Sequence, residues 1–181
     1  MRRFDLDMPK LKSLIHYVCA CYERSSLGKT KLNKILWFSD VAAYRDFGAP
    51  ITGETYVKQK YGPVPSHIDE ALRELFFESK LIERDAPIYK YSKKEFISLA
   101  QPDISLFSAA EMEIINETAQ IICDNYTAAQ ISEMSHDMLW KTADMNEELP
   151  YEATLVKYVE PSPEAIKWAQ SMLIEQCEVA S

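Results

Sequence analysis

The chain has 181 residues, of which 47% are hydrophobic and 27% charged, and its formal net charge is −8 at pH 7. This length predicts one compact domain spanning residues 1–181, with a well-buried core. No apolar run reaches the roughly 20 residues that a membrane-spanning helix needs, and acids occupy the place of a signal peptide's apolar region, so we expect a cytoplasmic protein without a membrane partner.

Two helices are predicted at the start of the chain. Over residues 9–24 apolar side chains recur at steps of three and four, which is typical of a helix with one buried face. A second helix is expected to begin at Thr30, whose side chain can cap it, and to stop near Phe47. Its many apolar side chains place this second helix at the centre of the core.

A short strand and a stiff corner come next. Residues 55–61 alternate in the manner of a strand. The following Gly62-Pro63-Val64-Pro65 combines a glycine that tolerates positive φ with two prolines that fix φ and lack a backbone donor. We expect a rigid corner that presents Tyr61 and leads into a third helix capped by Ser66. Such a corner either holds a binding surface in place or only joins a strand to a helix.

The rest of the chain is predicted to contain a hairpin and further helices. Residues 81–84 and 88–91 look like paired strands around a turn at 85–87. Ser108, with Glu111 at the capping-box position, and Thr127 are expected to begin two helices. A C-terminal part over 150–179 is expected to pack on the rest, with a short strand at 155–159 and an amphipathic helix at 163–178.

These elements predict a mainly α fold with a small β component, of the α+β class. In the N-terminal half, the order of a helical pair, a strand, a helix and a hairpin is similar to the arrangement in a winged helix. That likeness concerns topology and does not by itself establish DNA binding.

Signatures of metal binding and catalysis are missing from the sequence. The residues of interest are few: His16, His67, His136, Cys19, Cys21, Cys123 and Cys177. They form neither an HExxH nor a CxxC motif, which favours buried free thiols over a metal site. Gly28-Lys29-Thr30 lacks the upstream glycine of a P-loop. Ser135, His136 and Asp137 are consecutive in the chain, so they cannot take the relative positions of a catalytic triad. We expect Ser135 and His136 to hydrogen-bond a helix junction, with Trp140 packed one turn beyond His136. We therefore expect no catalytic residue, cofactor or metal, and a protein that is not an enzyme.

Charge is divided unevenly along the chain. Residues 1–100 hold 17 basic against 13 acidic side chains, whereas residues 101–181 hold 3 against 15. The acidic half would be repelled by phosphates, so nucleic-acid binding is disfavoured unless the basic half acts alone. The acids either keep helix faces in solution or meet a basic partner, such as a toxin that acts on nucleic acids.

Three segments occur in order within residues 10–145. The first, at 31–40, reads Lys-Leu-Asn-Lys-Ile-Leu-Trp-Phe-Ser-Asp; the second, at 51–65, contains Ile-Thr-Gly and then Tyr-Gly-Pro-Val-Pro; the third, at 131–140, reads Ile-Ser-Glu-Met-Ser-His-Asp-Met-Leu-Trp. Together they resemble the Panacea domain of SocA-like antitoxins, a family long known as phage-associated proteins. Trp37 and Ser39 stand where the family pattern has Tyr and Ala.

The resemblance implies the antitoxin of a toxin–antitoxin system, which neutralises a cognate protein toxin by direct binding. It also implies that a member can carry its toxin to an ATP-dependent protease. Interface hot spots favour Trp, Tyr and Arg. We expect the partner contacts on and beside the corner, at Tyr56, Lys58, Lys60, Tyr61, Gly62, Pro63, Val64, Pro65 and His67. The alternative is a winged-helix-like DNA-binding or phage-encoded regulatory protein, in which Lys90, Lys93 and Lys94 would contact phosphate.

Overall fold

The computed structural model describes residues 4–22, 27–88, 91–156, 162 and 164. In chain order the elements are α1 (Met8–Cys21), α2 (Lys29–Phe47), β1 (Tyr56–Gln59), β2 (Gly62–Pro65), α3 (Ile68–Phe77), β3 (Leu81–Ile88), β4 (Tyr91–Ser98), α4 (Ala109–Asn125), α5 (Ala128–Met134), α6 (Met138–Thr142) and the 3₁₀ helix η1 (Tyr151–Leu155). The fold is mainly helical with a small β component, as predicted from the sequence, and the described strands form two small antiparallel hairpins where one was predicted.

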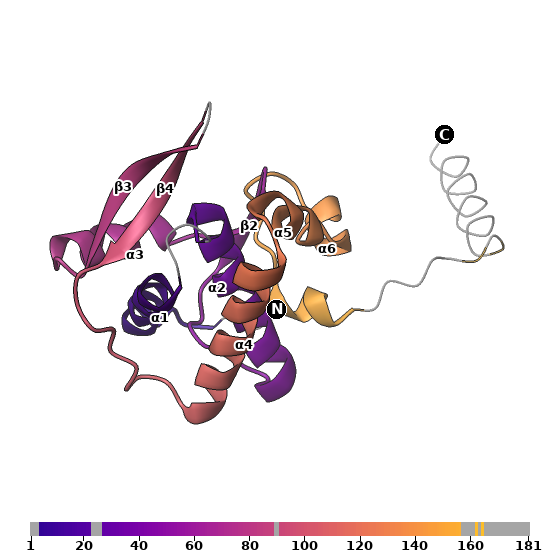
Figure 1. Ribbon diagram of the computed structural model, residues 1–181. Helices are drawn as coiled ribbons and strands as arrows, with labels where there is room; N and C mark the ends of the chain where they lie inside the picture. The colour runs from indigo at the N-terminus through magenta and orange to yellow at the C-terminus, as the bar shows by residue number, and fades with distance from the viewer. Residues whose placement is uncertain (1–3, 23–26, 89–90, 157–161, 163, 165–181) are drawn as a thin grey trace.

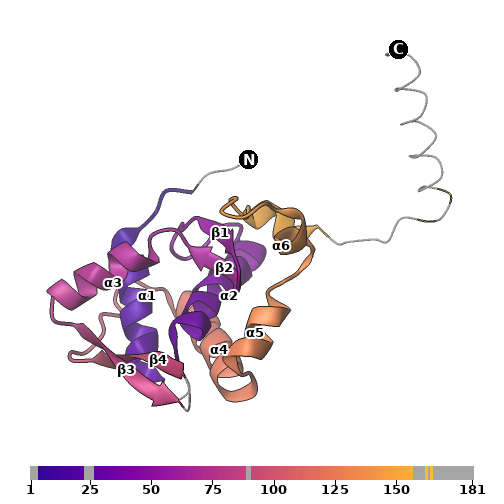
Figure 2. The ribbon, with the colours of Figure 1, turned by 90° about the horizontal axis from the view of Figure 1, so that it is seen from above.

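Helix α2 lies at the centre of the molecule. It packs against α1, α4, α5 and β2, and Figures 1 and 2 show it running between the other elements. Its buried side chains lie all round the helix and include the polar Lys34 and Asp40, which explains why the apolar run extends beyond one face. The ring of Trp37 lies 4.9 Å from that of Tyr56 and 6.2 Å from that of Tyr151, so α2, β1 and η1 share one aromatic cluster.

Residues 62–65 form a strand and not only a corner. β1 and β2 pair antiparallel with Gln59 opposite Gly62 and Tyr56 opposite Pro65, which leaves Lys60 and Tyr61 as the turn. In such a ladder every second residue points its N–H away from the partner strand. Both prolines occupy those outward positions, so β2 loses no bond to β1 through its missing donors. The sequence analysis predicted a corner at these residues and did not predict the strand β2.

The outer edge of β1 is also occupied, by the chain between α6 and η1. Lys58 N donates to Glu147 O at 2.9 Å, Asn146 N donates to Lys58 O at 3.0 Å, and Leu149 N donates to Tyr56 O at 2.8 Å. β1 is therefore held between β2 on one side and residues 146–149 on the other.

The second hairpin is longer than predicted, and its turn lies elsewhere. Residues 85–87, expected to be the turn, belong to β3 and pair with residues 92–94 of β4, while residues 89–90 lie outside the described residues. Proline and aspartate suggested a turn, but the pairing of eight residues on each strand outweighs that local preference. The hairpin follows α3 and packs on α1 and α3, as a wing would. In the described chain β1 pairs with β2 in a separate sheet, so the likeness to a winged helix stops at element order.

Helix starts were predicted well only where a capping box was present. The Ser108–Glu111 box of α4 and the Thr127 cap of α5 are confirmed. Thr30 is not a cap, because α2 begins one residue earlier, after Gly28. Ser66 is not a cap either: its N–H donates to Thr55 O at 2.9 Å and extends the first hairpin, so His67 precedes α3.

The buried side chains from α1 to Tyr151 form one core cluster. Cys19 and Cys123 are buried, as predicted, whereas Cys21 is exposed. Leu155 ends η1 instead of beginning a strand, while Cys177, residues 157–159 and all of the expected C-terminal helix except Glu164 lie outside the described residues. None of the described helices is long and apolar enough to cross a membrane.

Candidate functional site

A buried lysine supports the turn of the first hairpin. We call residues 59–62 the hairpin tip. Lys34, on α2, is only 1% exposed, and its Nζ donates to Pro63 O at 2.8 Å. Burial lowers the pKa of this amine to about 7. The carbonyl it binds points outward from β2, so Lys34 fastens the tip to the central helix.

The glycine of the tip fills a space with no room for a side chain. Gly62 has φ +96°, a conformation that favours glycine. A Cβ at this position would lie 2.1 Å from Ser135 Oγ and 2.6 Å from Lys34 Nζ. The tip is thus wedged between α2 and the end of α5.

Side chains from α5 and α6 bind the backbone of the tip. Ser132 Oγ donates to Tyr61 O at 2.9 Å, and Trp140 Nε1 donates to Gln59 O at 3.0 Å. The imidazole of His136 stacks on Trp140 with 3.8 Å between ring centroids, which confirms the packing predicted for this pair. Lys58 Nζ donates to Ala143 O at 2.7 Å and lies 4.4 Å from the centroid of the Trp140 ring.

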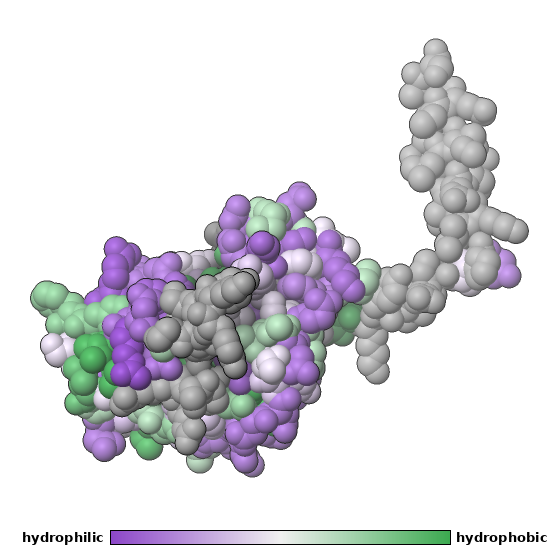
Figure 3. All heavy atoms as spheres, turned by 45° about the horizontal axis from the view of Figure 1, so that its top comes forward, coloured by the Kyte–Doolittle hydropathy of each residue, from purple (hydrophilic) through white to green (hydrophobic). Residues whose placement is uncertain are grey.

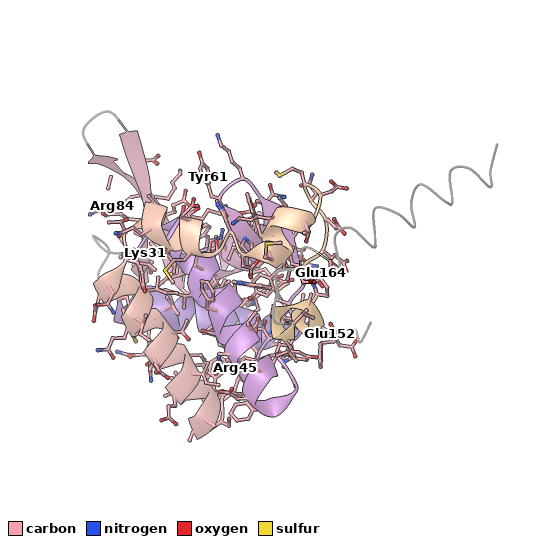
Figure 4. All side chains as sticks on the ribbon, turned by 90° about the vertical axis from the view of Figure 1, so that its right-hand side faces the viewer. Lys31, Arg45, Tyr61, Arg84, Glu152 and Glu164 are labelled. Carbon is pink, nitrogen blue, oxygen red and sulfur yellow. The ribbon has the colours of Figure 1, made fainter. Side chains whose placement is uncertain are left out.

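These contacts leave the tip's own side chains facing solvent. Tyr61 is 60% exposed, and the Lys60 amine lies 5.3 Å from its ring. Figure 4 shows Tyr61 at the upper edge of the molecule. The backbone beneath Tyr61 is bonded on two sides, so the aromatic ring stands on a fixed support.

The structure divides the nine predicted contact residues into a supporting and an exposed group. Tyr56 is 1% exposed and donates through its hydroxyl to Asp40 Oδ2 at 2.7 Å, so it is a core residue and no surface contact. Four more are buried or half-buried parts of β2: Gly62, Pro63, Val64 and Pro65. Lys58 is half-buried and committed to Ala143. Of the nine residues only Lys60 and Tyr61 are exposed, so these two are the predicted contacts whose side chains are accessible to a partner.

His67, the ninth predicted residue, belongs to a buried carboxylate centre at the base of the hairpin. Glu54 is fully buried and accepts hydrogen bonds from Thr55 N at 2.6 Å and from His67 N at 3.1 Å. His67 Nδ1 lies 2.8 Å from Glu54 Oε1. The hydroxyl of Tyr151 donates to the backbone oxygen of Glu54 at 2.5 Å. This centre joins β1, α3 and η1.

Asp40 forms a second buried carboxylate centre nearby. It accepts hydrogen bonds from Thr52 N at 2.9 Å, from Thr52 Oγ1 at 2.6 Å and from the Tyr56 hydroxyl. Burial raises the pKa of Asp40 to about 6, although these donors favour its charged form. Sequence reasoning missed Asp40, Glu54 and Lys34 as buried polar groups. The available signal was the presence of charged residues within an apolar helix and beside a strand, since buried charges require partners.

The polar atoms of the two carboxylate centres bind one another and the backbone. Within the described residues no group of three His, Cys, Asp or Glu side chains could hold a metal ion. A cavity of about 200 Å³ lies beside Glu54, Tyr56 and Tyr151, which is below the roughly 300–1,000 Å³ of a typical small-molecule site.

Two cations of the predicted DNA-contacting hairpin are paired with its own acids. Arg84 Nη2 lies 2.9 Å from Glu95 Oε2, and Lys94 Nζ lies 2.7 Å from Glu83 Oε1 and 3.2 Å from Asp85 Oδ1. The side chain of Lys93 is not described, and Lys90 lies outside the described residues. In the part of the hairpin that the structure describes, Arg84 and Lys94 would each have to break an ion pair before contacting a phosphate.

Comparison with known proteins identifies one family. The family model described as Antitoxin SocA-like, Panacea domain, matches residues 32–141. No curated protein and no solved structure matches the chain. The matched range begins in α2 and ends in α6, so it contains Lys34, Gly62, Ser132, Ser135 and Trp140, which together hold the hairpin tip.

Proposed function

Because the chain belongs to the SocA-like antitoxin family with the Panacea domain, we propose that it neutralises a protein toxin by direct binding at the hairpin tip. The family supports an antitoxin-like role with a protein toxin as partner. The proposal adds a mechanism, binding without catalysis, and a place for it on the molecule. Both partners would meet in the cytoplasm.

The observation that carries the proposal is the convergence of three distant segments on one exposed turn. Lys34, Ser132 and Trp140 each donate a hydrogen bond to the backbone of residues 59–63, over sequence separations of 29, 71 and 81 residues. The result of all three bonds is to fix the backbone that carries Tyr61. An aromatic side chain on a preorganised backbone loses little entropy on binding and is a favoured hot spot.

Direct binding also fits the chemistry of the polar groups. Lys34 has a lowered pKa, but its amine is buried beneath the tip and bound to a carbonyl, as a structural group would be. The DNA-binding alternative has less support, because Arg84 and Lys94 are ion-paired within their own hairpin. Delivery of the bound toxin to an ATP-dependent protease would be a further step that leaves the tip occupied by the toxin.

The proposal is tested by producing the chain together with the product of the adjacent gene. Host growth and co-purification are measured for the wild type, for Tyr61→Ala and for Phe77→Ala. Phe77 is the matched control, because it is 92% exposed at the end of α3. With Ile82 and Leu99 it belongs to another exposed apolar region, and Figure 3 shows hydrophobic surface at that end of the molecule. Tyr61→Ala should lose about tenfold or more in affinity and Phe77→Ala almost none.

Each outcome has a clear meaning. If the neighbour is toxic alone and tolerated only with the wild type or Phe77→Ala, the antitoxin proposal and its contact site both stand. Equal protection by Tyr61→Ala would move the contact away from the tip. A harmless neighbour that does not co-purify would overturn the antitoxin proposal, and a salt-sensitive shift of DNA from upstream of the gene would then favour the regulatory alternative.

A further inference from the structure

Three exposed methionines lie on the segments whose other residues bond to the backbone of the first hairpin. Met134 ends α5, Met138 begins α6, and Met145 follows α6; all three are among the exposed large apolar side chains. Each belongs to a segment that is bonded to β1 or the tip, through Ser132, Trp140 and Asn146. We call Tyr61 and these three methionines the tip surface.

Methionine at a surface has a specific physical use. Its unbranched, polarisable side chain adapts to irregular apolar shapes, and it is common on surfaces that bind varied partners. Three such side chains exposed on the segments that hold the first hairpin are costly in water unless a partner covers them. The tip surface therefore suits an apolar face of another protein.

Acidic side chains outnumber basic ones around the tip surface. Between residues 133 and 148 the exposed charged side chains are Glu133, Asp137, Lys141, Asp144, Glu147 and Glu148. The side chain of Glu133 is 83% exposed, and its Oε2 lies 3.5 Å from Nδ1 of His136. On the hairpin itself Lys60 is exposed, whereas the Lys58 amine is committed to Ala143 O. A partner that fits this charge pattern carries Lys or Arg around its apolar face.

The hairpin offers no free backbone edge for an added strand. Residues 146–149 occupy the outer edge of β1. On β2 the outward positions are Pro63 and Pro65, which lack donors, and the carbonyl of Pro63 accepts from Lys34. A partner must therefore bind through side chains, as an amphipathic helix does, and not by extending the sheet.

We propose that the tip surface binds a cationic amphipathic helix of the toxin, with apolar side chains on Tyr61, Met134 and Met138 and with Lys or Arg beside Glu133 and Asp144. This inference rests on the proposed antitoxin function and names the chemistry of the partner. Attraction between the exposed acids of residues 133–148, which we call the acidic rim, and the cationic helix accelerates association. The methionines supply the apolar contact in the bound complex.

The test compares two charge reversals of equal size with the purified product of the adjacent gene. Glu133→Lys with Asp144→Lys changes the rim, whereas Glu113→Lys with Glu117→Lys changes exposed positions on α4. Each pair shifts the net charge by the same amount, and circular dichroism with thermal melting checks that both variants fold. Should the lysine pair at the rim fail to fold, Glu133→Gln with Asp144→Asn takes its place.

The expected result is a loss of affinity of about 30-fold or more for the rim pair and of less than about threefold for the α4 pair. Wild-type affinity should fall as salt is raised. Hydrogen exchange on the toxin should show protection, in the complex, of a helix with net positive charge. If the wild type binds but both pairs behave alike, or the protected segment is acidic or extended, the cationic helix is refuted while the antitoxin function stands. If the wild type does not bind, the proposed function fails and this inference fails with it.

Discussion

Replacing Gly62 by alanine tests whether the hairpin tip is wedged in place. The substitution adds one carbon at a position where φ is +96° and where that carbon would lie 2.1 Å from Ser135 Oγ and 2.6 Å from Lys34 Nζ. Both neighbours are buried, so neither can swing into solvent without losing a hydrogen bond. The added carbon must therefore push the tip away from α2 and α5.

Two penalties set the expected size of the effect. A non-glycine residue in a strained backbone region costs about 1–3 kcal/mol. Forcing an extra carbon into a packed site costs about 1–3 kcal/mol more. We expect Gly62→Ala to lower the free energy of unfolding by about 4 kcal/mol, which lowers Tm by about 8–16 °C in a chain of this length.

Gly48→Ala is the matched control for backbone strain. Gly48 also has positive φ, +75°, but an added Cβ there would meet nothing within 4 Å. It should cost only about 1 kcal/mol, since strain is partly offset by the stiffer unfolded chain. Urea denaturation followed by tryptophan fluorescence gives both values under the same conditions.

A double variant separates the packing contribution from the strain. Adding Ser135→Ala removes the atom nearest to the new carbon, so the cost of the pair should be smaller than the sum of the single costs by about 1 kcal/mol. If Gly62→Ala costs no more than Gly48→Ala, or if the double variant is simply additive, the tip is not held as described.

Three further predictions concern the buried groups. Burial lowers the pKa of Lys34 from 10.5 to about 7, so between these two pH values the unfolded chain binds more protons than the folded chain. The free energy of unfolding of the wild type should therefore rise with pH across this range. Urea titrations at successive pH values measure that rise, and Lys34→Met should remove it. Burial raises the pKa of Asp40 from 3.8 to about 6, so between these two pH values the folded chain binds more protons than the unfolded chain. The free energy of unfolding should therefore fall as pH rises through this range. If Asp40→Asn shows the same fall, the fall comes from another group. Trp37→Ala should cost about 3–5 kcal/mol as a core truncation, against less than about 1 kcal/mol for the exposed Tyr61→Ala, and comparable melting temperatures for the two would contradict the assignment of Tyr61 to the surface.

Local signals account for what the sequence predicted correctly. A capping box involves residues three apart, so Ser108 with Glu111 is visible without knowledge of the fold. The apolar content of α2 likewise indicated a central helix, because burial on all sides removes the amphipathic period.

Long-range contacts decide the features that the sequence did not predict. Pro63 and Pro65 argue against a strand unless one knows that both face outward from β1. Asp85 and Pro87 suggest a turn unless one knows that β4 continues to Ser98. Tyr56 was predicted to contact a partner because tyrosine is common at interfaces. The structure shows that its hydroxyl donates to the buried Asp40, which explains why this tyrosine lies in the core. The placement of Tyr61 as an exposed anchor stays a prediction until binding is measured.

The hairpin tip is completed by residues that are synthesised long after it. Bonds to Tyr61 O, Gln59 O and Glu54 O come from residues 71, 81 and 97 positions further along the chain. Contacts of such long range form late in folding, because the intervening chain must first be ordered. On the ribosome, a chain that has already exposed α1, α2 and the hairpin still lacks α5, α6 and η1. The toxin-binding surface that we propose would therefore become competent only after Met145 has emerged, since α5, α6 and Met145 all belong to it or hold it.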